Sequence, residues 1–382
     1  MLNTPPLSLY IHLPWCVRKC PYCDFNSHRQ PLNPGYSDYI DALLADLRFQ
    51  LSSIQGRGIE TIFIGGGTPS LFPASEIRRL LHEVSLLVGG INAVEVTLEA
   101  NPGTLEAGRY AGYREAGINR LSIGVQTFND RALQSLGRIH GSEEIYKAVS
   151  QAREAGFENI NLDLMFGLPE QSIEEARIDV ETAINLNPEH ISYYQLTIEP
   201  NTRFALSPPP LLPSDDHLWD IQLQGRARLV DAGYQQYEIS AYSRVQKECR
   251  HNLNYWTFGD YLGIGAGAHS KLSDQTQQRI RRSSRVRSPE AYMAAAGTRG
   301  ALSGEYFLKD TDLVIEFMMN LLRLNGGFTA QLFRDRTGLP LSRVEPILAE
   351  AQRRGLLGTD GMEFGATAWG HRYLNDLLTL FI

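Results

Sequence analysis

The chain has 382 residues and a net charge of −7, with 36 Lys and Arg against 43 Asp and Glu. This length can bury one barrel-sized core and a smaller appended unit. The acidic balance argues against a nucleic-acid-binding surface, because neutralising phosphates needs clustered cations. The N-terminal residues do not read as a signal peptide, and no run approaches the ~18 apolar residues of a transmembrane segment, so we expect a cytoplasmic protein.

The first half of the chain alternates β-rich apolar runs with amphipathic segments, which is typical of parallel strands joined by helices. Six strands are predicted, at Leu7–His12, Thr61–Ile64, Val94–Glu99, Arg120–Val125, Asn159–Leu164 and His190–Ile198. Helices are predicted at Tyr36–Leu51, Ser75–Leu87, Ser142–Ala155 and Ile173–Leu186. Because parallel crossovers are right-handed, the expected fold class is α/β, a partial (β/α)6 barrel.

The second half of the chain extends this barrel and then changes character. A helix near Asp215–Ala232 and a strand at Tyr237–Tyr242 are expected, whereas the Arg-rich stretch Asp274–Ser288 is predicted to be a solvated loop. The last helices and the segment Gly358–Phe364 predict a small winged-helix-like C-terminal α domain. The expected divisions are residues 1–245, 246–306 and 307–382.

Three of the four cysteines lie within eight residues, which is too close for ordinary disulfide pairing and indicates metal ligation. Cys16, Cys20 and Cys23 follow the first predicted strand with the spacing C-x3-C-x2-C. Thiolates select zinc or iron–sulfur clusters, and ligand type alone leaves both open. Three thiolates leave one iron of a [4Fe–4S] cube free for a substrate. A structural zinc would need a fourth protein ligand, and neighbouring Asp24 and His28 have no customary zinc-finger spacing.

Two glycine-rich segments follow the cysteines in the chain. Gly65–Pro69 comes directly after the second strand, where glycines permit close backbone approach and free amide groups, and Thr68 adds a hydroxyl. A charged amino-acid moiety could be held there, but the Lys of a nucleotide P-loop is absent. Gly263–Ala268 fits a relaxed dinucleotide fingerprint. Because no convincing strand precedes it, we expect a flexible loop near the cofactor instead.

The cysteine loop at the head of a predicted barrel resembles the radical S-adenosylmethionine superfamily. Further motifs resemble the coproporphyrinogen oxidase HemN group: Tyr10–Cys16, Gly65–Ser70, Glu99–Gly103, Gly124–Phe128, Leu136–Arg138 and Asp163–Pro169. The resemblance implies a [4Fe–4S] cluster on Cys16, Cys20 and Cys23. It also implies that the amino and carboxylate groups of S-adenosylmethionine chelate the open iron, and that one electron from the cluster cleaves the sulfonium to a radical.

The same resemblance implies a set of S-adenosylmethionine contacts. They are Tyr10, Gly66, Gly67, Thr68, Glu99, Gln126, Arg138 and Asp163. Their chemistry agrees, since Glu99 and Asp163 can accept from ribose hydroxyls or an ammonium group and Arg138 can hold a carboxylate. Each residue taken alone also has a structural explanation. A carboxylate at a strand end often caps the next helix, and an Arg is usually a surface residue.

Two features distinguish the chain from the oxidase group and suggest a different member. Phe25 stands where the oxidase has a further cysteine, and the chain begins close to the first strand without a long leading segment. The string His251-Asn-Leu-Asn-Tyr255-Trp256 resembles the HemW subgroup of haem chaperones. This implies haem as a further cofactor, with His251 as axial ligand and both aromatic rings on the porphyrin. Cys249 is either a thiolate ligand or a buried thiol.

Three functions from different classes are compatible with these residues. The first is a haem chaperone that passes haem to an acceptor haemoprotein, with the cluster and S-adenosylmethionine as a switch, redox partner or structural requirement. The alternative is an oxygen-independent coproporphyrinogen III oxidase that decarboxylates propionate side chains, against which Phe25 speaks. The third is a zinc-stabilised module that contacts nucleic acid, which the acidic balance disfavours. The acceptor, cleavage of S-adenosylmethionine and formation of a homodimer are left open.

Overall fold

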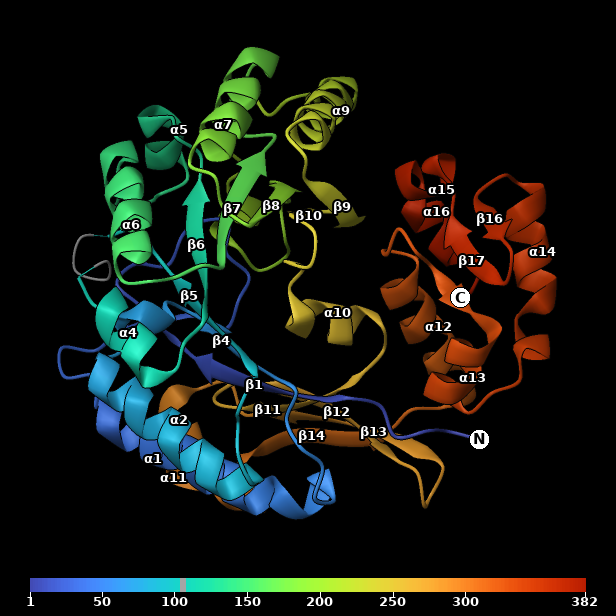
Figure 1. The fold of residues 1–382 in the computed structure, drawn as a ribbon, viewed down its shortest axis with the longest axis horizontal. Coiled ribbons are helices and arrows are strands. Elements are labelled where there is room, and N and C mark those ends of the chain that lie inside the picture. The colour runs from blue at the N-terminus through green and yellow to red at the C-terminus, as the bar shows by residue number, and fades with distance from the viewer. Residues whose placement is uncertain (104–107) are drawn as a thin grey trace.

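The computed structural model, which describes residues 1–103 and 108–382, contains one large sheet of 12 strands in the order β14-β13-β12-β11-β1-β4-β5-β6-β7-β8-β10-β9. The six predicted strands are its parallel centre: β1 (Leu7–Leu13), β4 (Thr61–Gly66), β5 (Glu95–Ala100), β6 (Arg120–Gln126), β7 (Ile160–Phe166) and β8 (His190–Gln195). The sheet is curved and open (Figure 1), so the predicted partial barrel is confirmed.

Helices cover the outer face of the parallel strands (Figure 1). They are α1 (Tyr36–Gln50), α2 (Ala74–Val88), α4 (Tyr110–Ala116), α5 (Asp130–Ser135), α6 (Ser142–Glu154) and α7 (Ile173–Asn185). Capping chemistry fixes their ends: Ser172 and Glu175 form a capping box at the start of α7. Gly117 and Gly156 end α4 and α6 with φ of 107° and 83°, which glycine adopts without strain.

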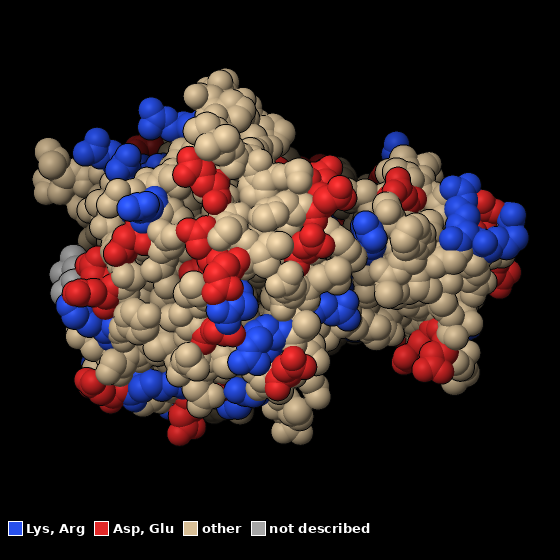
Figure 2. Space-filling model, turned by 90° about the horizontal axis from the view of Figure 1, so that it is seen from above, with Lys and Arg blue, Asp and Glu red and all other residues tan. Residues whose placement is uncertain are grey.

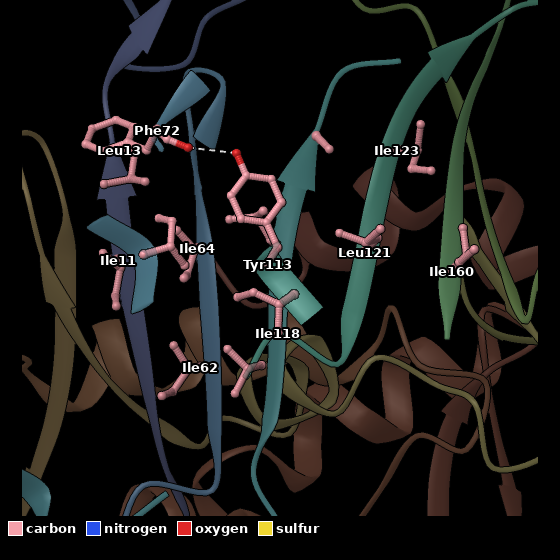
Figure 3. Packing of buried hydrophobic residues seen from close by; sticks show 14 of the residues in the cluster. Ile11, Leu13, Ile62, Ile64, Phe72, Tyr113, Ile118, Leu121, Ile123 and Ile160 are labelled. Carbon is pink, nitrogen blue, oxygen red and sulfur yellow. Dashed lines mark hydrogen bonds between the residues drawn. The ribbon is translucent and has the colours of Figure 1, made fainter. Parts of the chain in front are cut away.

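Along the parallel strands, apolar residues toward the helices alternate with mostly polar, aromatic or glycine residues toward the barrel interior. Figure 3 shows the helix-facing set, in which Ile11, Ile62, Leu121 and Ile160 project into one packed layer. The hydroxyl of Tyr113 donates to the Phe72 carbonyl oxygen (2.7 Å) and ties α4 to the loop after β4. Burying each aliphatic side chain contributes about 1.5–3 kcal/mol, so register is fixed and the inner residues must face the interior.

The expectation of a loop at Asp274–Ser288 is wrong. The segment contains strand β13 (Arg279–Arg285), between β12 (His269–Asp274) and β14 (Leu302–Phe307). The arginines of this segment made it resemble an exposed loop. Arg285 is nevertheless buried, because it forms an ion pair with Asp46 of α1 (2.8 Å), a residue far away in the sequence. Strand propensity depends on such cross-element partners more than helix propensity does.

Two smaller expectations also need correction. Strand β11 (Asp260–Ile264) precedes the glycine segment 263–268 and pairs in parallel with β1, although no strand was expected there. The single strand expected at Tyr237–Tyr242 is a hairpin of β9 (Gln235–Glu238) and β10 (Ala241–Ser243). The remaining elements of the central region are β2 (Trp15–Cys16), β3 (His28–Arg29), α8 (Arg203–Leu206), α9 (Asp215–Asp231), α10 (Arg250–Trp256) and α11 (Pro289–Ala295).

The C-terminal unit combines helices with a three-stranded sheet, β15-β17-β16, and confirms the winged-helix-like expectation. Its elements are α12 (Asp310–Leu321), β15 (Phe328–Thr329), α13 (Ala330–Thr337), α14 (Glu345–Arg353), β16 (Leu357–Asp360), β17 (Glu363–Ala366), α15 (Ala368–Arg372) and α16 (Leu374–Thr379). Its core includes Phe317 and also takes in Leu2 and Phe258 from the main body. Helix α10 lies between the two parts (Figure 1).

The described residues contain no helix with the length and apolarity needed to cross a membrane. Acidic and basic side chains are interspersed over most of the face shown in Figure 2. A mixed surface of this kind has no extended field of one sign.

Candidate functional site

A cavity of about 420 Å³ opens at the carboxyl ends of the parallel strands. We call it the cysteine cavity. Its walls include most of the predicted cluster and S-adenosylmethionine residues: Cys16, Cys20, Cys23, Gly66, Gly67, Thr68, Glu99, Gln126, Arg138 and Asp163. Residues from five strand ends thus meet at one place, as the barrel topology requires. Tyr10 is the exception, because its ring lies in a neighbouring cavity described below.

Each of the three cysteine sulfurs has a polar side chain within hydrogen-bond distance. The Thr68 hydroxyl donates to Cys16 Sγ (3.4 Å), Arg138 Nη1 donates to Cys20 Sγ (3.7 Å), and the Ser27 hydroxyl lies 3.7 Å from Cys23 Sγ. Donors of this kind stabilise thiolates. Burial meanwhile raises the pKa of Cys16 to about 11, so the proton must leave when a metal binds.

Cys16, Cys20 and Cys23 all line the cysteine cavity. Among residues 1–103 and 108–382, no three His, Cys, Asp or Glu side chains converge closely enough to hold one metal ion. A [4Fe–4S] cube takes each of its thiolate ligands on a separate iron. Cys16, Cys20 and Cys23 would be the residues that hold it.

Close contacts explain the glycines at the end of β4. Gly66 has φ of 121°, and a Cβ there would lie 2.7 Å from the His12 ring. The expected free amides are not found, because the Gly66 amide donates to Glu99 Oε2 (3.1 Å) and the Gly67 amide donates to the Leu13 carbonyl (2.7 Å). The segment therefore ties the ends of β1, β4 and β5 together.

Two carboxyl groups, Glu99 and Asp163, line the cysteine cavity from β5 and β7. Burial, followed by repulsion from Asp163, raises the pKa of Glu99 to about 7. Burial also raises the pKa of Asp163, although the Ser122 hydroxyl (2.9 Å) and the Asn161 amide (2.8 Å) donate to it. Such a pair favours a cationic ligand, which relieves the repulsion.

Gln126 and Arg138 are held in place by residues that the sequence reasoning missed. Gln126 ends β6 with φ of 70°, an uncommon conformation for a non-glycine residue, and its Oε1 accepts from the Tyr194 hydroxyl (2.8 Å). Arg138 Nη2 donates to Asn101 Oδ1 (2.6 Å) and to the Gly124 carbonyl (2.9 Å). Their position in the sequence could have indicated them, since Asn101 and Tyr194 also lie at strand ends.

A second cavity of about 760 Å³ adjoins the first, and we call it the histidine cavity. The two cavities share Asp24, Phe25, Gly66 and Glu99 in their walls. Other walls of the histidine cavity come from β1, β11, α10, the antiparallel strands β12 to β14 and the loop after β13. They include Tyr10, His251, Tyr255, Tyr261, His269, Arg282, Arg287 and Tyr306. A ligand in either cavity would therefore lie beside a ligand in the other.

His251 is held as a neutral imidazole at the edge of the histidine cavity. The Thr61 hydroxyl donates to Ser8 Oγ (2.7 Å), so His251 Nδ1 donates to Thr61 Oγ1 (3.0 Å). Burial, and then the charge of Arg120, lowers the pKa of His251 to about 3. Its Nε2 has no hydrogen-bond partner among the described residues and keeps its lone pair. A metal-ligating histidine has this combination of fixed tautomer and free nitrogen.

The neighbours of His251 differ from the sequence-based expectation in two respects. Tyr255, one helical turn along α10, also lines the histidine cavity. Trp256 is not among the residues lining that cavity. Its ring packs under the Arg323 guanidinium (4.3 Å) and against the core of the C-terminal unit. Cys249 is fully buried outside both cavities, and burial raises the pKa of its thiol to about 11, which favours the buried-thiol alternative.

The chain matches the family model of the Radical SAM superfamily over residues 10–183 and that of the HemN C-terminal domain over residues 308–370. Fold and family models together define a radical SAM superfamily protein with a HemN-type C-terminal domain. Among curated relatives, "Heme chaperone HemW" of Haemophilus influenzae is 50% identical over 100% of this chain and 99% of the relative. The Escherichia coli protein of that name is 48% identical over 100% of both chains. The chain belongs to the HemW family.

More distant comparisons agree with this assignment. "Heme chaperone HemW" of Bacillus subtilis is 33% identical over 98% of this chain and 99% of the relative. The solved structure of coproporphyrinogen III oxidase (HemN) from Escherichia coli is similar with a TM-score of 0.83 and 25% identity, covering 99% of this chain and 90% of that chain. The overall fold is therefore shared with an enzyme whose name indicates a different activity.

Proposed function

We propose that this protein is a haem chaperone, which binds haem in the histidine cavity and passes it to an acceptor haemoprotein. The observation that carries the proposal is His251, a neutral imidazole whose Nδ1 donates to Thr61 and whose Nε2 is free beside a cavity of about 760 Å³. Neutral imidazole is a common haem-iron ligand. The names of the relatives of highest identity given above support the same function.

The walls of the histidine cavity suit a porphyrin. Tyr10, Tyr255, Tyr261 and Tyr306 supply aromatic surface for a flat apolar ring. Arg287 is exposed at the cavity and forms no ion pair with any described residue, so it is available to a propionate carboxylate. Arg282 is less available, because its guanidinium already pairs with Glu316.

The cysteine cavity would hold a [4Fe–4S] cluster and S-adenosylmethionine. Cys16, Cys20 and Cys23 are the thiolate donors, and a cluster bound there supplies an open iron and one-electron chemistry. Arg138 compensates the negative charge at Cys20 through its 3.7 Å contact. Glu99 would accept from the ammonium group and Asp163 from the ribose hydroxyls, in line with the raised pKa values of both carboxyl groups.

Haem titration tests the proposed ligand. Haem added to the purified protein should give a Soret shift that is lost in His251→Ala. His82→Ala, which removes an exposed histidine on α2, is the matched control and should behave as the unaltered protein. Unchanged haem spectra in His251→Ala would refute the ligand assignment. Iron and sulfide analysis of anaerobically reconstituted protein tests the cluster in the same preparation, and zinc in place of iron would overturn it.

Oxygen-independent coproporphyrinogen III oxidase activity is the second candidate, favoured by the structural similarity to HemN (TM-score 0.83). Phe25 argues against it, since it stands where the oxidase has a further cysteine and its side chain is exposed between the two cavities. Anaerobic incubation with dithionite, S-adenosylmethionine and coproporphyrinogen separates the candidates. We expect no protoporphyrinogen, and its formation would replace the chaperone proposal by the oxidase.

A further inference from the structure

The N-terminus of α10, the helix that carries His251, is capped from outside the helix. Cys249 occupies the N-cap position, and its side chain makes no capping hydrogen bond. Glu95, the first residue of β5, caps it instead: its carboxylate accepts from the amides of Arg250 (3.3 Å) and His251 (3.1 Å). A carboxylate is the favoured partner for these amides, because helix N-termini carry partial positive charge.

A buried chain of hydrogen bonds leads from the same helix end across the barrel floor. The Cys249 amide donates to the Tyr237 hydroxyl (3.4 Å), and the Tyr237 hydroxyl lies 2.8 Å from His190 Nε2. His190 Nδ1 lies 2.6 Å from Asn161 Oδ1, and Asn161 Nδ2 donates to Asp163 Oδ1 (2.8 Å). These side chains come from β9, β8 and β7, so the chain joins α10 to the strands that carry the cysteine cavity.

All hydrogen bonds in this series are donated in the same direction, from α10 toward Asp163. Because Asn161 donates through its amide nitrogen, its Oδ1 accepts from His190 Nδ1, and His190 Nε2 then accepts from the Tyr237 hydroxyl. Burial, and then the charge of Arg120, lowers the pKa of His190, which keeps the singly protonated ring that this pattern needs. A head-to-tail chain that ends on a carboxylate strengthens each of its bonds cooperatively.

The positive charge of Arg120 offsets the cost of burying the carboxyl groups of Glu95 and Asp163. It is the first residue of β6, is 2% exposed, and its Nε has no hydrogen-bond partner among the described residues. Its charge interacts with those of Glu95 and Asp163. Burial, and then the same charge, lowers the pKa of both His190 and His251. One buried cation thus lies among two buried carboxyl groups and two buried imidazoles, and its charge offsets that of the carboxylates.

We propose that Glu95 and Tyr237 are positioning residues that fix the orientation of His251 toward the haem iron. The inference rests on the proposed haem function. Neither residue lines either cavity, so each acts through α10 and not through contact with haem. Because the series of hydrogen bonds continues to Asp163, the helix that carries His251 is connected to a wall of the cysteine cavity.

Tyr237→Phe and Glu95→Gln test the inference, with Tyr234→Phe as matched control. Tyr234 is buried three residues before Tyr237, and its hydroxyl donates to the Pro188 carbonyl (2.6 Å) away from α10. Tyr237→Phe should weaken haem affinity roughly three- to tenfold, the equivalent of one buried hydrogen bond. It should also change the Soret position and the electron paramagnetic resonance signal of bound ferric haem. Tyr234→Phe should leave both at their unaltered values.

One further variant, Glu95→Leu, completes the design. Glu95→Gln keeps one acceptor oxygen, so it should weaken binding less than Glu95→Leu, a graded response that general loss of stability would not give. If Glu95→Leu fails to fold, the haem affinity and spectra of Tyr237→Phe alone test the inference. Suppose that His251→Ala loses haem, as the proposed function requires. Haem spectra of Tyr237→Phe identical to those of Tyr234→Phe would then refute the inference. If His251→Ala binds haem unchanged, the proposed function fails first and the inference fails with it.

Discussion

Gly67→Ala should damage the cysteine cavity without removing any predicted ligand. A Cβ on Gly67 would lie 2.6 Å from the Trp15 carbonyl oxygen and 2.8 Å from the Pro14 carbonyl oxygen. Both contacts are to backbone, so no side chain can rotate away. The Gly67 amide also donates to the Leu13 carbonyl (2.7 Å), which fixes the approach of the two strand ends.

The size of the effect follows from these distances. Relieving the closer contact needs a shift of about 0.8 Å between the loop after β4 and the segment that leads into Cys16. Overpacking of this kind costs about 1–3 kcal/mol of unfolding free energy. We expect urea unfolding to report a loss in that range, and anaerobic reconstitution to give less iron and sulfide per chain.

Gly58→Ala is the matched control, because a Cβ on Gly58 meets no atom within 4 Å and the residue does not have a positive φ. That substitution should be neutral or stabilise by up to about 1 kcal/mol, since alanine restricts the unfolded chain. Equal unfolding free energies and equal cluster content in Gly67→Ala and Gly58→Ala would refute the reasoning.

Three other predictions concern charge. Because burial raises the pKa of Glu99 to about 7, S-adenosylmethionine affinity measured by calorimetry should rise with pH from about 6 to 8 as Glu99 ionises, and Glu99→Gln should abolish this dependence. Arg287→Gln should weaken haem binding about fivefold but leave haem dimethyl ester binding unchanged; equal losses for both would exclude a propionate contact. Asp46→Asn should cost about 3 kcal/mol in urea unfolding, because it breaks a buried ion pair, whereas Glu83→Gln in an exposed pair should cost under about 1 kcal/mol.

The features predicted well from the sequence are those that depend on neighbours along the chain. The strand β1 is marked by apolar residues that alternate with Tyr10 and His12, and the helix α7 by the amphipathic pattern of Ile173–Leu186. The spacing of the cysteines and the glycines after β4 likewise predicted a loop and a tight strand end. Parallel topology then brings strand ends together, so the sequence alone predicts that Glu99 and Asp163 lie on one wall.

The sequence failed where a residue's role depends on a distant partner. Strand β13 was missed because nothing near Arg285 indicates that Asp46 of α1 neutralises it. The motif around His251 suggested a ligand, yet only the structure separates Tyr255, which lines the histidine cavity, from Trp256, which packs on the C-terminal unit.

By itself the sequence determined that three thiols head a partial α/β barrel, because spacing and periodicity are local properties of the chain. The tertiary structure decided that Thr61 fixes the proton on His251 and that Glu95 caps the helix beneath it. It also decided that the cysteine and histidine cavities share Glu99 as a wall. These contacts join residues more than 150 positions apart, so they exist only once the strands have paired.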